Sequence, residues 1–466
     1  MGLRIILTVA TIAAAAVSTA AAAAAEVSTT LNTDVTKYSF NDANYTYCDP
    51  GYPQTQSYAA VPDAQLEFVQ AVVRHGDRTP VHLIPNDETT WTCDGINENM
   101  YLHSSADPKN TTGSVQQVID IPAWNGKHGF SNQVWRGTCE VGQLTDHGKL
   151  QHRTLGSHLR SIYIDRLGFL PDKLTNPEQQ VYARSTYIWR TKNSAESLLG
   201  SLWPDRGVLP GSAIKLHSLP QFVETMYGNA DACPAIKNIL TLISKTDQYQ
   251  QFLKSQGPLM AKLAGIFNVN GNRWSDTWDG YFDVLNARHC NSKDLPCSHA
   301  LVGGAANNST AKCATVEDVL QVQHNSHYEL TYKMRDSTWS KQLMRLYIGS
   351  FIGTLKEQME QHVAGKAPGL KFALYSGHDT TVLPLLAALR ASNQGMLWPP
   401  YASNILFELW KKSDGSRVVR VIYNGEVLRL MEGSEWCDLN ACPIDTFYKH
   451  LDEYIPRDIA TECVFK

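Results

Sequence analysis

The sequence predicts an α/β protein with a Rossmann-like core of three layers, a mixed central sheet and an inserted helical cap domain. Three short runs, each ending at turn-forming or charged residues, predict strands at 68–73, 179–183 and 371–375, of which the first and third are largely apolar and expected to be buried. Two further β-rich runs flank Asp414-Gly415, which is typical of an antiparallel hairpin. Between the second and third strands, a polar helical region at 220–323 predicts the cap.

The composition bounds the size and the partners of the protein. A chain of 466 residues can bury one large core or two domains. Its net charge is −4, from 41 basic and 45 acidic residues, so the charge gives no indication of a nucleic-acid partner. The 15 histidines lack a metal-binding spacing such as HExxH, so we expect neither a metal ion nor another cofactor.

The N-terminus, 1–25, is typical of a secretory signal peptide. Arg4 supplies the positive start, 5–17 is apolar, and 20–25 offers small residues for cleavage. An N-terminal membrane anchor is the alternative, but the stretch is short and alanine-rich for a span. We therefore expect a protein without a membrane anchor that is secreted or resides in the lysosomal or vacuolar lumen.

Ten cysteines follow the predicted signal peptide, and their even number predicts disulfides in an oxidising compartment. A zinc site is less favoured, because no paired CxxC motifs occur. Four Asn-x-Ser/Thr sequons predict glycosylated surface loops at Asn44, Asn110, Asn307 and Asn308.

The first strand ends at a basic cluster, RHGDRTP at 74–80. Arg74 and Arg78 could fork onto the oxygens of a phosphate, and His75 between them could attack the phosphorus or accept a proton. Gly76 permits a tight backbone there. A solvated basic loop is the alternative. The position favours a ligand site, because ligands of open α/β sheets bind beyond the carboxyl ends of strands.

An excursion at 85–145 follows the basic cluster. It lacks sustained periodicity, and its place in the chain predicts a rim over the site. Thr145 then predicts the N-cap of a helix with one apolar face. The second strand ends at Arg184. The next helix carries Arg190, for which a salt bridge at the helix start is the favoured interpretation.

The third strand repeats the pattern of the first. It ends at SGHD, 376–379, and a helix follows at once, so its N-terminal amides can face an anion. We therefore expect three strand ends to meet at one edge of the sheet. Before this strand, 339–362 predicts one long amphipathic helix. In the cap, Trp274 and Trp278 predict core packing at i, i+4 spacing.

These motifs resemble those of the histidine acid phosphatases, the secreted branch of the histidine phosphatase superfamily. The resemblance rests on RHGxRxP, LTxxGxxQ, RST and SGHDTT with PPYAS, at 74–80, 144–151, 184–186 and 376–403. A short loop between Cys437 and Cys442 resembles one in lysosomal and prostatic-type acid phosphatases and could close a local disulfide. Tyr187 departs from the family, which usually has an acidic residue after Ser-Thr.

The resemblance implies a role for each of six residues. His75 is the nucleophile and becomes phosphorylated. Asp379 protonates the leaving group and then acts as the base on water. Binding of the phosphate falls to Arg74, Arg78, Arg184 and His378.

The implied protein is a secreted acid phosphatase that hydrolyses small phosphomonoesters through a phosphohistidine intermediate. Its α/β core comprises 26–219 and 324–466, and the cap comprises 220–323. A phytase or a phosphosugar phosphatase of the xylose-phosphate type, specialised by the cap, is the alternative. A mutase fits less well, since mutases of this superfamily are typically cytosolic. An inactive secreted binding module on the same scaffold is a candidate from a different class. The sequence leaves open whether the protein forms a homodimer.

Overall fold

The computed structural model describes nine stretches of the chain. They are 45–87, 89–93, 98–102, 112–116, 135–204, 213–298, 301–302, 305–306 and 312–464. All of them belong to one unit, Asp42–Lys466. The predicted signal peptide and the asparagines of the four sequons lie outside the described residues.

An eight-stranded mixed sheet forms the centre of the fold, with the order β13-β12-β11-β1-β10-β6-β7 and β14 beside β12. Four neighbouring strands run parallel: β1 (Ala64–Arg74), β10 (Phe372–Gly377), β6 (Val181–Ser185) and β7 (Leu216–Ser218). The remaining strands are antiparallel: β11 (Asn404–Lys412), β12 (Arg417–Tyr423), β13 (Glu426–Val427) and β14 (Cys442–Pro443). The predicted mixed sheet and the hairpin at Asp414-Gly415 are confirmed.

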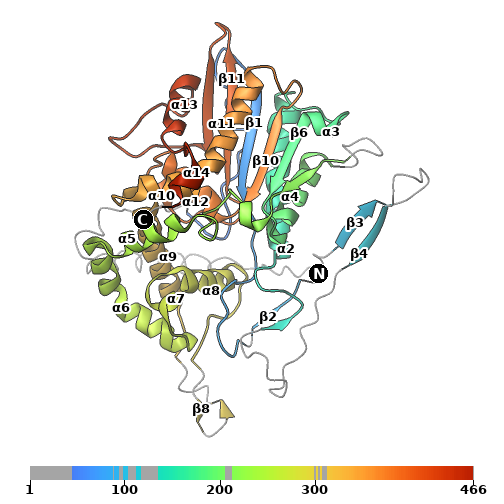
Figure 1. The fold of residues 1–466 in the computed structure, drawn as a ribbon. Helices are drawn as coiled ribbons and strands as arrows, with labels where there is room; N and C mark the ends of the chain where they lie inside the picture. The colour runs from blue at the N-terminus through green and yellow to red at the C-terminus, as the bar shows by residue number, and fades with distance from the viewer. Residues whose placement is uncertain are drawn as a thin grey trace, which may run out of the picture. The chain divides into compact units, whose positions relative to one another are not determined.

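Helices cover both faces of this sheet, so the core has three layers (Figure 1). On one face, α2 (Asp146–Arg160) and α4 (Trp189–Leu202) pack on alternate residues of β1, including Val69 and Val73. Residues of β1 with the opposite parity face α11 (Gly349–Val363), where the Gln70 amide donates to the Leu355 carbonyl. Side chains of a strand alternate between faces, so β1 is buried on both of its faces.

A group of helices lies beyond the carboxyl ends of the parallel strands (Figure 1). It comprises α5 (Pro234–Ser244), α6 (Asp247–Phe267), α7 (Asn272–Ser275), α8 (Asp279–Cys290) and α9 (Val316–Thr331). Trp274 and Trp278 are both buried and pack on Tyr281, in agreement with the predicted core packing. Helix α9 continues past residue 323, the predicted end of the cap.

The excursion at 85–145 contains short strands where it is described. β2 (Thr90–Trp91) pairs with β5 (Arg136–Gly137), and β3 (Glu98–Leu102) pairs with β4 (Thr112–Gln116). A disulfide between Cys93 and Cys139 lies in a small core with two tryptophans. These strands are too short to give a periodic signal in the sequence.

The prediction of one long helix over 339–362 is wrong. The segment forms two helices, α10 (Ser340–Tyr347) and α11, which are separated at Ile348. The backbone of Tyr454 lies directly against Gly349, where an added Cβ would stand 2.1 Å from the Tyr454 carbonyl oxygen. The interruption keeps the apolar side chains of both helices buried, so the amphipathic pattern does not reveal it.

This close approach gives a stability prediction. We expect Gly349→Ala to lower the free energy of unfolding by about 1–3 kcal/mol, because the new methyl group displaces packed backbone. Gly353→Ala is the matched control, since the nearest atom to its added Cβ is 3.6 Å away. Alanine there should be neutral or stabilising. Urea unfolding of the two variants measures the difference, and equal midpoints would contradict the packing explanation.

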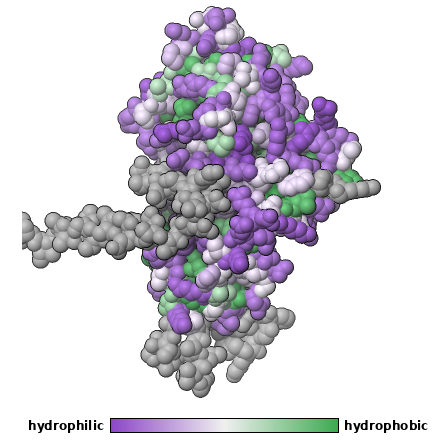
Figure 2. Space-filling model, turned by 90° about the vertical axis from the view of Figure 1, so that its left-hand side faces the viewer, coloured by the Kyte–Doolittle hydropathy of each residue, from purple (hydrophilic) through white to green (hydrophobic). Residues whose placement is uncertain are grey.

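All ten cysteines form disulfides, as the even count predicts. The pairs are Cys48–Cys290, Cys93–Cys139, Cys233–Cys463, Cys297–Cys313 and Cys437–Cys442. No helix in the described stretches is long and apolar enough to cross a bilayer. On the face in Figure 2, hydrophilic residues predominate, and described apolar residues form small scattered groups.

Candidate active site

The candidate site lies where β1, β10 and β6 end. The strands are parallel and in register, with Arg74 opposite Gly377 and Ser376 opposite Ser185. The backbone N–H of His75 donates to the Gly377 carbonyl oxygen at 2.9 Å. The turns after the three strands therefore begin at the same edge of the sheet, as expected for a ligand site in this kind of fold.

His75 is held as a neutral imidazole. Its Nδ1 is 2.8 Å from the carbonyl oxygen of Gly76. A carbonyl can only accept, so Nδ1 carries the proton and Nε2 keeps its lone pair. Burial and the positive charges of Arg190, Arg74 and Arg78 lower the pKa of His75 well below its ordinary value. The side chain is therefore a ready nucleophile even in acid.

Arg74 is fully buried, and four groups fix its guanidinium. Nη1 donates to the Pro399 carbonyl at 2.6 Å, and Nη2 donates to the Tyr47 hydroxyl at 2.7 Å. The same Nη2 is 2.9 Å from Oδ2 of Asp379. The ring of Tyr401 lies 4.5 Å from the guanidinium carbon. The orientation of Arg74 is thus set before any ligand arrives.

Arg78 is oriented by an aspartate that the sequence does not single out. Its Nη1 donates to Oδ1 of Asp283, on helix α8, at 2.6 Å. The second oxygen of Asp283 accepts from the backbone N–H groups of Val81 and His82 and lies 3.0 Å from the His82 ring nitrogen. Burial raises the pKa of Asp283, but Arg78 and His82 together bring it well below its ordinary value, so Asp283 stays ionised.

Arg184 and Arg190, the two arginines after β6, differ in their charged partners. Nη2 of Arg184 donates to Glu224 at 2.5 Å and to Thr225 at 3.1 Å, so a buried acid of the helical region engages it. Arg190 has no ion pair among the described residues, in contrast to the salt bridge expected at the helix start. After burial, its charge is the strongest influence on the pKa of His75.

Arg190 is buried close to the other charged groups of the site. Burial and the charge of Arg78 lower the pKa of Arg190 to about 9. The charge of Arg190 is also the strongest influence, after burial, on the pKa of His378. Its Nε is buried and has no hydrogen-bond partner among the described residues. Arg74, Arg78 and Arg190 therefore concentrate positive charge beside His75, which an anion would relieve.

His378 and Asp379 begin helix α12 (Asp379–Ala388). The ring centroid of His378 is 5.5 Å from that of His75, and its Nε2 is 3.0 Å from the Thr186 hydroxyl. Asp379 Oδ2 accepts from the Trp398 indole at 2.9 Å. Burial raises the pKa of Asp379, but Arg74, Arg78 and Trp398 together bring it below its ordinary value. Without a ligand, Asp379 is a carboxylate.

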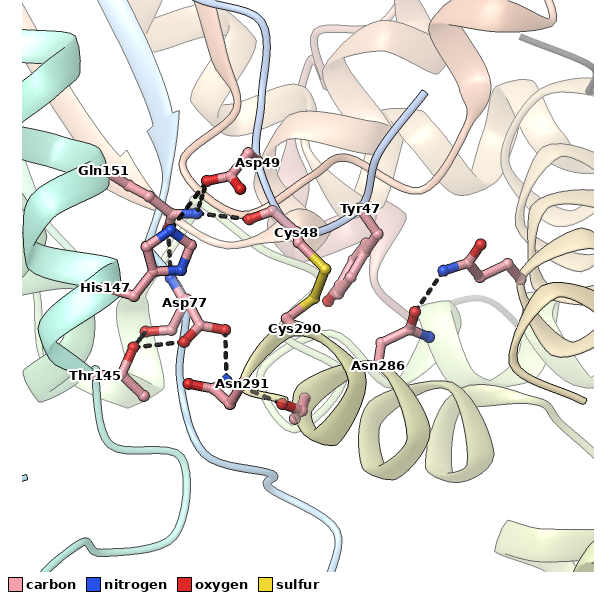
Figure 3. Close-up of a disulfide and its surroundings, with 12 residues drawn as sticks. Tyr47, Cys48, Asp49, Asp77, Thr145, His147, Gln151, Asn286, Cys290 and Asn291 are labelled. Carbon is pink, nitrogen blue, oxygen red and sulfur yellow. Dashed lines mark hydrogen bonds and ion pairs between the residues drawn. A yellow bond between two sulfur atoms is a disulfide. The ribbon is translucent and has the colours of Figure 1, made fainter. Parts of the chain in front are cut away.

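The LTxxGxxQ motif holds the loop after β1, 75–80, which we call the signature loop. The Thr145 hydroxyl donates to Asp77 Oδ2 at 2.5 Å, and the Asp77 backbone N–H donates to Gln151 Oε1 at 2.8 Å. Asn291 binds the other oxygen of Asp77 (Figure 3). Gly148 also lies directly against the signature loop, where its lack of a side chain lets it approach the backbone of Asp77. The predicted N-cap role of Thr145 is confirmed, since its side chain accepts from the Gly148 N–H.

The arrangement is suited to binding and transferring a phosphoryl group. Three guanidiniums neutralise charge without titrating, one neutral histidine offers a nucleophile, and one carboxyl group stands beside them. In the described stretches, no cluster of three or more histidine, cysteine, aspartate or glutamate residues could hold a metal ion.

Comparison with known proteins identifies the family to which the chain is similar. The family described as the histidine phosphatase superfamily (branch 2) matches residues 65–424. Counting factor 60 of Dictyostelium discoideum is 26% identical over 406 residues, covering 85% of this chain and 88% of that protein. Human prostatic acid phosphatase is 26% identical over 416 residues, covering 86% and 88% of the two chains.

Two further relatives extend the comparison. 2-phosphoxylose phosphatase 1 of Danio rerio is 26% identical over 414 residues, with 82% of this chain and 77% of that protein covered. Among solved structures, a Klebsiella phytase has the same fold, with a TM-score of 0.51 at 16% identity, covering 87% and 100% of the two chains.

The class of protein follows from the extent of the family match. The chain belongs to branch 2 of the histidine phosphatase superfamily, the histidine acid phosphatases. This confirms the family resemblance and the α/β fold with a mixed sheet.

Proposed function

We propose that this protein hydrolyses small phosphomonoesters in two steps through a phosphohistidine on His75. The observation that carries the proposal is the state of His75: buried, neutral, oriented by the Gly76 carbonyl and adjacent to three arginines. Membership of the histidine acid phosphatases supports the reaction class. Hydrolysis of 4-nitrophenyl phosphate by the purified protein tests it, and a folded protein without turnover would leave the inactive binding module as the function.

In the first step, Nε2 of His75 attacks phosphorus in line, the N–P bond forms and the ester P–O bond breaks. Asp379 gives its proton to the departing oxygen. In the second step, Asp379 takes a proton from water, the water oxygen attacks phosphorus, and the N–P bond breaks to release phosphate. His378 would donate a hydrogen bond to the transferring phosphoryl group, and the arginines would neutralise its charge.

The third phosphate-binding arginine is Arg190 rather than Arg184 in this proposal. Arg190 has no charged partner among the described residues, and it influences both histidines of the site. Arg184 is engaged by Glu224. Arg74 and Arg78 also have carboxylate partners, so an ion pair alone does not exclude a phosphate ligand. Arg184 differs in that the main positive charges acting on the pKa of His75 and of His378 are those of Arg190, Arg74 and Arg78, with Arg184 not among them.

The exchange of arginines is testable by paired substitutions. We expect Arg190→Ala to lower kcat/KM for 4-nitrophenyl phosphate about 10²–10³-fold, the cost of removing one preorganised donor. Arg184→Ala should reduce thermal stability, since it leaves Glu224 buried without its partner, but change kcat/KM of the folded protein by less than about tenfold. Steady-state kinetics beside a melting curve for each variant measures both effects. A larger kinetic loss for Arg184→Ala would restore Arg184 as the ligand.

The charges around Arg78 favour an ester with a single phosphate over phytate. Asp283 neutralises Arg78, and Asp279 is about half exposed and 3.3 Å from the His82 ring. A substrate with several phosphates needs an extended positive surface, which two carboxylates weaken here. Among the relatives, 2-phosphoxylose phosphatase 1 is named for a singly phosphorylated sugar. Turnover of aryl, sugar and inositol phosphates under one condition separates these substrates.

The location and organisation are part of the same proposal. Five disulfides favour secretion or residence in an oxidising lumen. The helical region at 220–323 would act as a cap, since it supplies Asp283 to Arg78 and Glu224 to Arg184. A homodimer stays an untested possibility, which sedimentation analysis of the purified protein would decide.

A further inference from the structure

A segment before the core, Tyr45–Asp49, contacts the candidate site from outside the family motifs. We call it the N-terminal strap. Tyr47 is its buried residue, with 3% of its surface exposed. The Tyr47 hydroxyl accepts from Nη2 of Arg74 at 2.7 Å, and the guanidinium carbon lies 5.0 Å from the centre of its ring. The ring also packs edge-on against Phe282 of α8 at 4.7 Å.

The strap has neither helix nor strand to fix it, so individual contacts must hold it. The Gln151 amide donates to the Cys48 carbonyl at 2.6 Å and to Asp49 Oδ1 at 2.9 Å. The one covalent contact is the Cys48–Cys290 disulfide, which joins residues 242 apart in sequence. Figure 3 shows Tyr47 beside this disulfide, with Gln151 and His147 around Asp49.

The far end of the disulfide belongs to a helix that already orients the other signature arginine. Cys290 is the last residue of α8, and Asp283 on the same helix binds Arg78 at 2.6 Å. Helix α8 therefore contacts Arg78 directly, through Asp283. It is connected to Arg74 indirectly, through the disulfide and Tyr47. Neither Tyr47 nor the disulfide lies in a motif that carries the family resemblance.

We propose that Tyr47 is a positioning residue for Arg74, and that the Cys48–Cys290 disulfide keeps Tyr47 in place by fastening the N-terminal strap to α8. The inference rests on the proposed function, in which Arg74 binds the phosphate. Nη2 of Arg74 is shared between Tyr47 and Asp379. Without the Tyr47 hydroxyl, the carboxylate alone holds that nitrogen. The guanidinium then meets the phosphate in a less fixed orientation.

Tyr47→Phe tests the positioning role, because it removes the hydroxyl and leaves the packed ring. The readout is the inhibition constant of inorganic phosphate against 4-nitrophenyl phosphate, which does not depend on the amount of folded enzyme. We expect this constant to rise about tenfold, the loss of one hydrogen bond to a charged group. Tyr45→Phe is the matched control: its hydroxyl donates to the Trp398 carbonyl at 2.9 Å, so the constant should stay within about twofold.

The disulfide is tested by replacing Cys48 and Cys290 together with serine. The control is the equivalent replacement of Cys437 and Cys442, whose disulfide closes a local loop of sequence separation 5. We expect only the first pair to raise the inhibition constant, by about the same factor as Tyr47→Phe. Adding Tyr47→Phe to it should produce little further rise, because both changes act through one contact.

Two results would overturn the inference. One is an unchanged constant in folded Tyr47→Phe. The other is a combined variant whose inhibition constant rises by the product of the two separate factors. The disulfide would then affect phosphate binding through a contact other than the one between Tyr47 and Arg74. Failure of the proposed function looks different: the wild-type protein itself would neither hydrolyse the ester nor be inhibited by phosphate.

Discussion

Replacing His75 with alanine is expected to abolish hydrolysis, with a fall in kcat of about 10⁴-fold or more. In the proposed mechanism the imidazole forms the covalent intermediate, and no other described residue of the site is assigned that role. The measurement is kcat on 4-nitrophenyl phosphate. Labelled phosphoprotein is counted in samples quenched in alkali, where phosphohistidine survives.

The control for this variant is another buried histidine. His450 is 8% exposed, and its Nε2 lies 2.8 Å from the Ala388 carbonyl. His450→Ala should reduce stability by a comparable amount and retain kcat. Near-normal turnover or labelling in folded His75→Ala would exclude His75 as the nucleophile.

The second large effect concerns Asp379 and depends on the leaving group. We expect Asp379→Asn to lower kcat for alkyl phosphates about 10²–10⁴-fold, because an alkoxide leaves poorly without a proton. The loss for 4-nitrophenyl phosphate should be smaller, since a nitrophenolate needs less protonation. The ratio of the two losses is the measurement. Equal losses would argue against the acid role and favour a purely electrostatic one.

The dependence on pH follows from the directions of two pKa shifts. Burial and the neighbouring arginines lower the pKa of His75, so the nucleophile stays neutral as the pH falls. Arg74 and Arg78 lower the pKa of Asp379 in the free enzyme, whereas a bound phosphate dianion raises it. The complex loses the acid as pH rises through that raised value. We therefore expect wild-type kcat to be higher in acid, and a rate that increases toward neutral pH and above would contradict this.

The parts of the fold that sequence reasoning located share one property: their signal is local. Phe68–Val73 and Phe372–Tyr375 are short, largely apolar runs on strands that are buried on both sides, and they lack the periodicity of an amphipathic helix. The break at Ile348 has no local signal. It depends on the backbone of Tyr454, which is distant in sequence and packs against Gly349.

The same distinction explains the site. His75, Arg74, Arg78, His378 and Asp379 immediately follow or end strands, so strand order alone brings them together. Arg190 lies further into the turn and first helix after β6, where sequence reasoning gives no orientation. Asp283 and Tyr47 reach the arginines from segments more than twenty residues away, through contacts that no spacing rule predicts. Their roles become visible only when the partners of each guanidinium are known.

The contact between Gly76 and Gly148 has a consequence for how this chain can evolve. A Cβ on Gly76 would lie 2.3 Å from the Gly148 carbonyl oxygen, and one on Gly148 would lie 2.2 Å from the Asp77 carbonyl oxygen. Each position is therefore closed to every side chain, whatever occupies the other. No compensating pair of substitutions exists, so neutral drift cannot pass through either site. We expect a deep mutational scan to find both glycines intolerant, including in variants whose catalytic histidine is already lost and which are selected for folding alone.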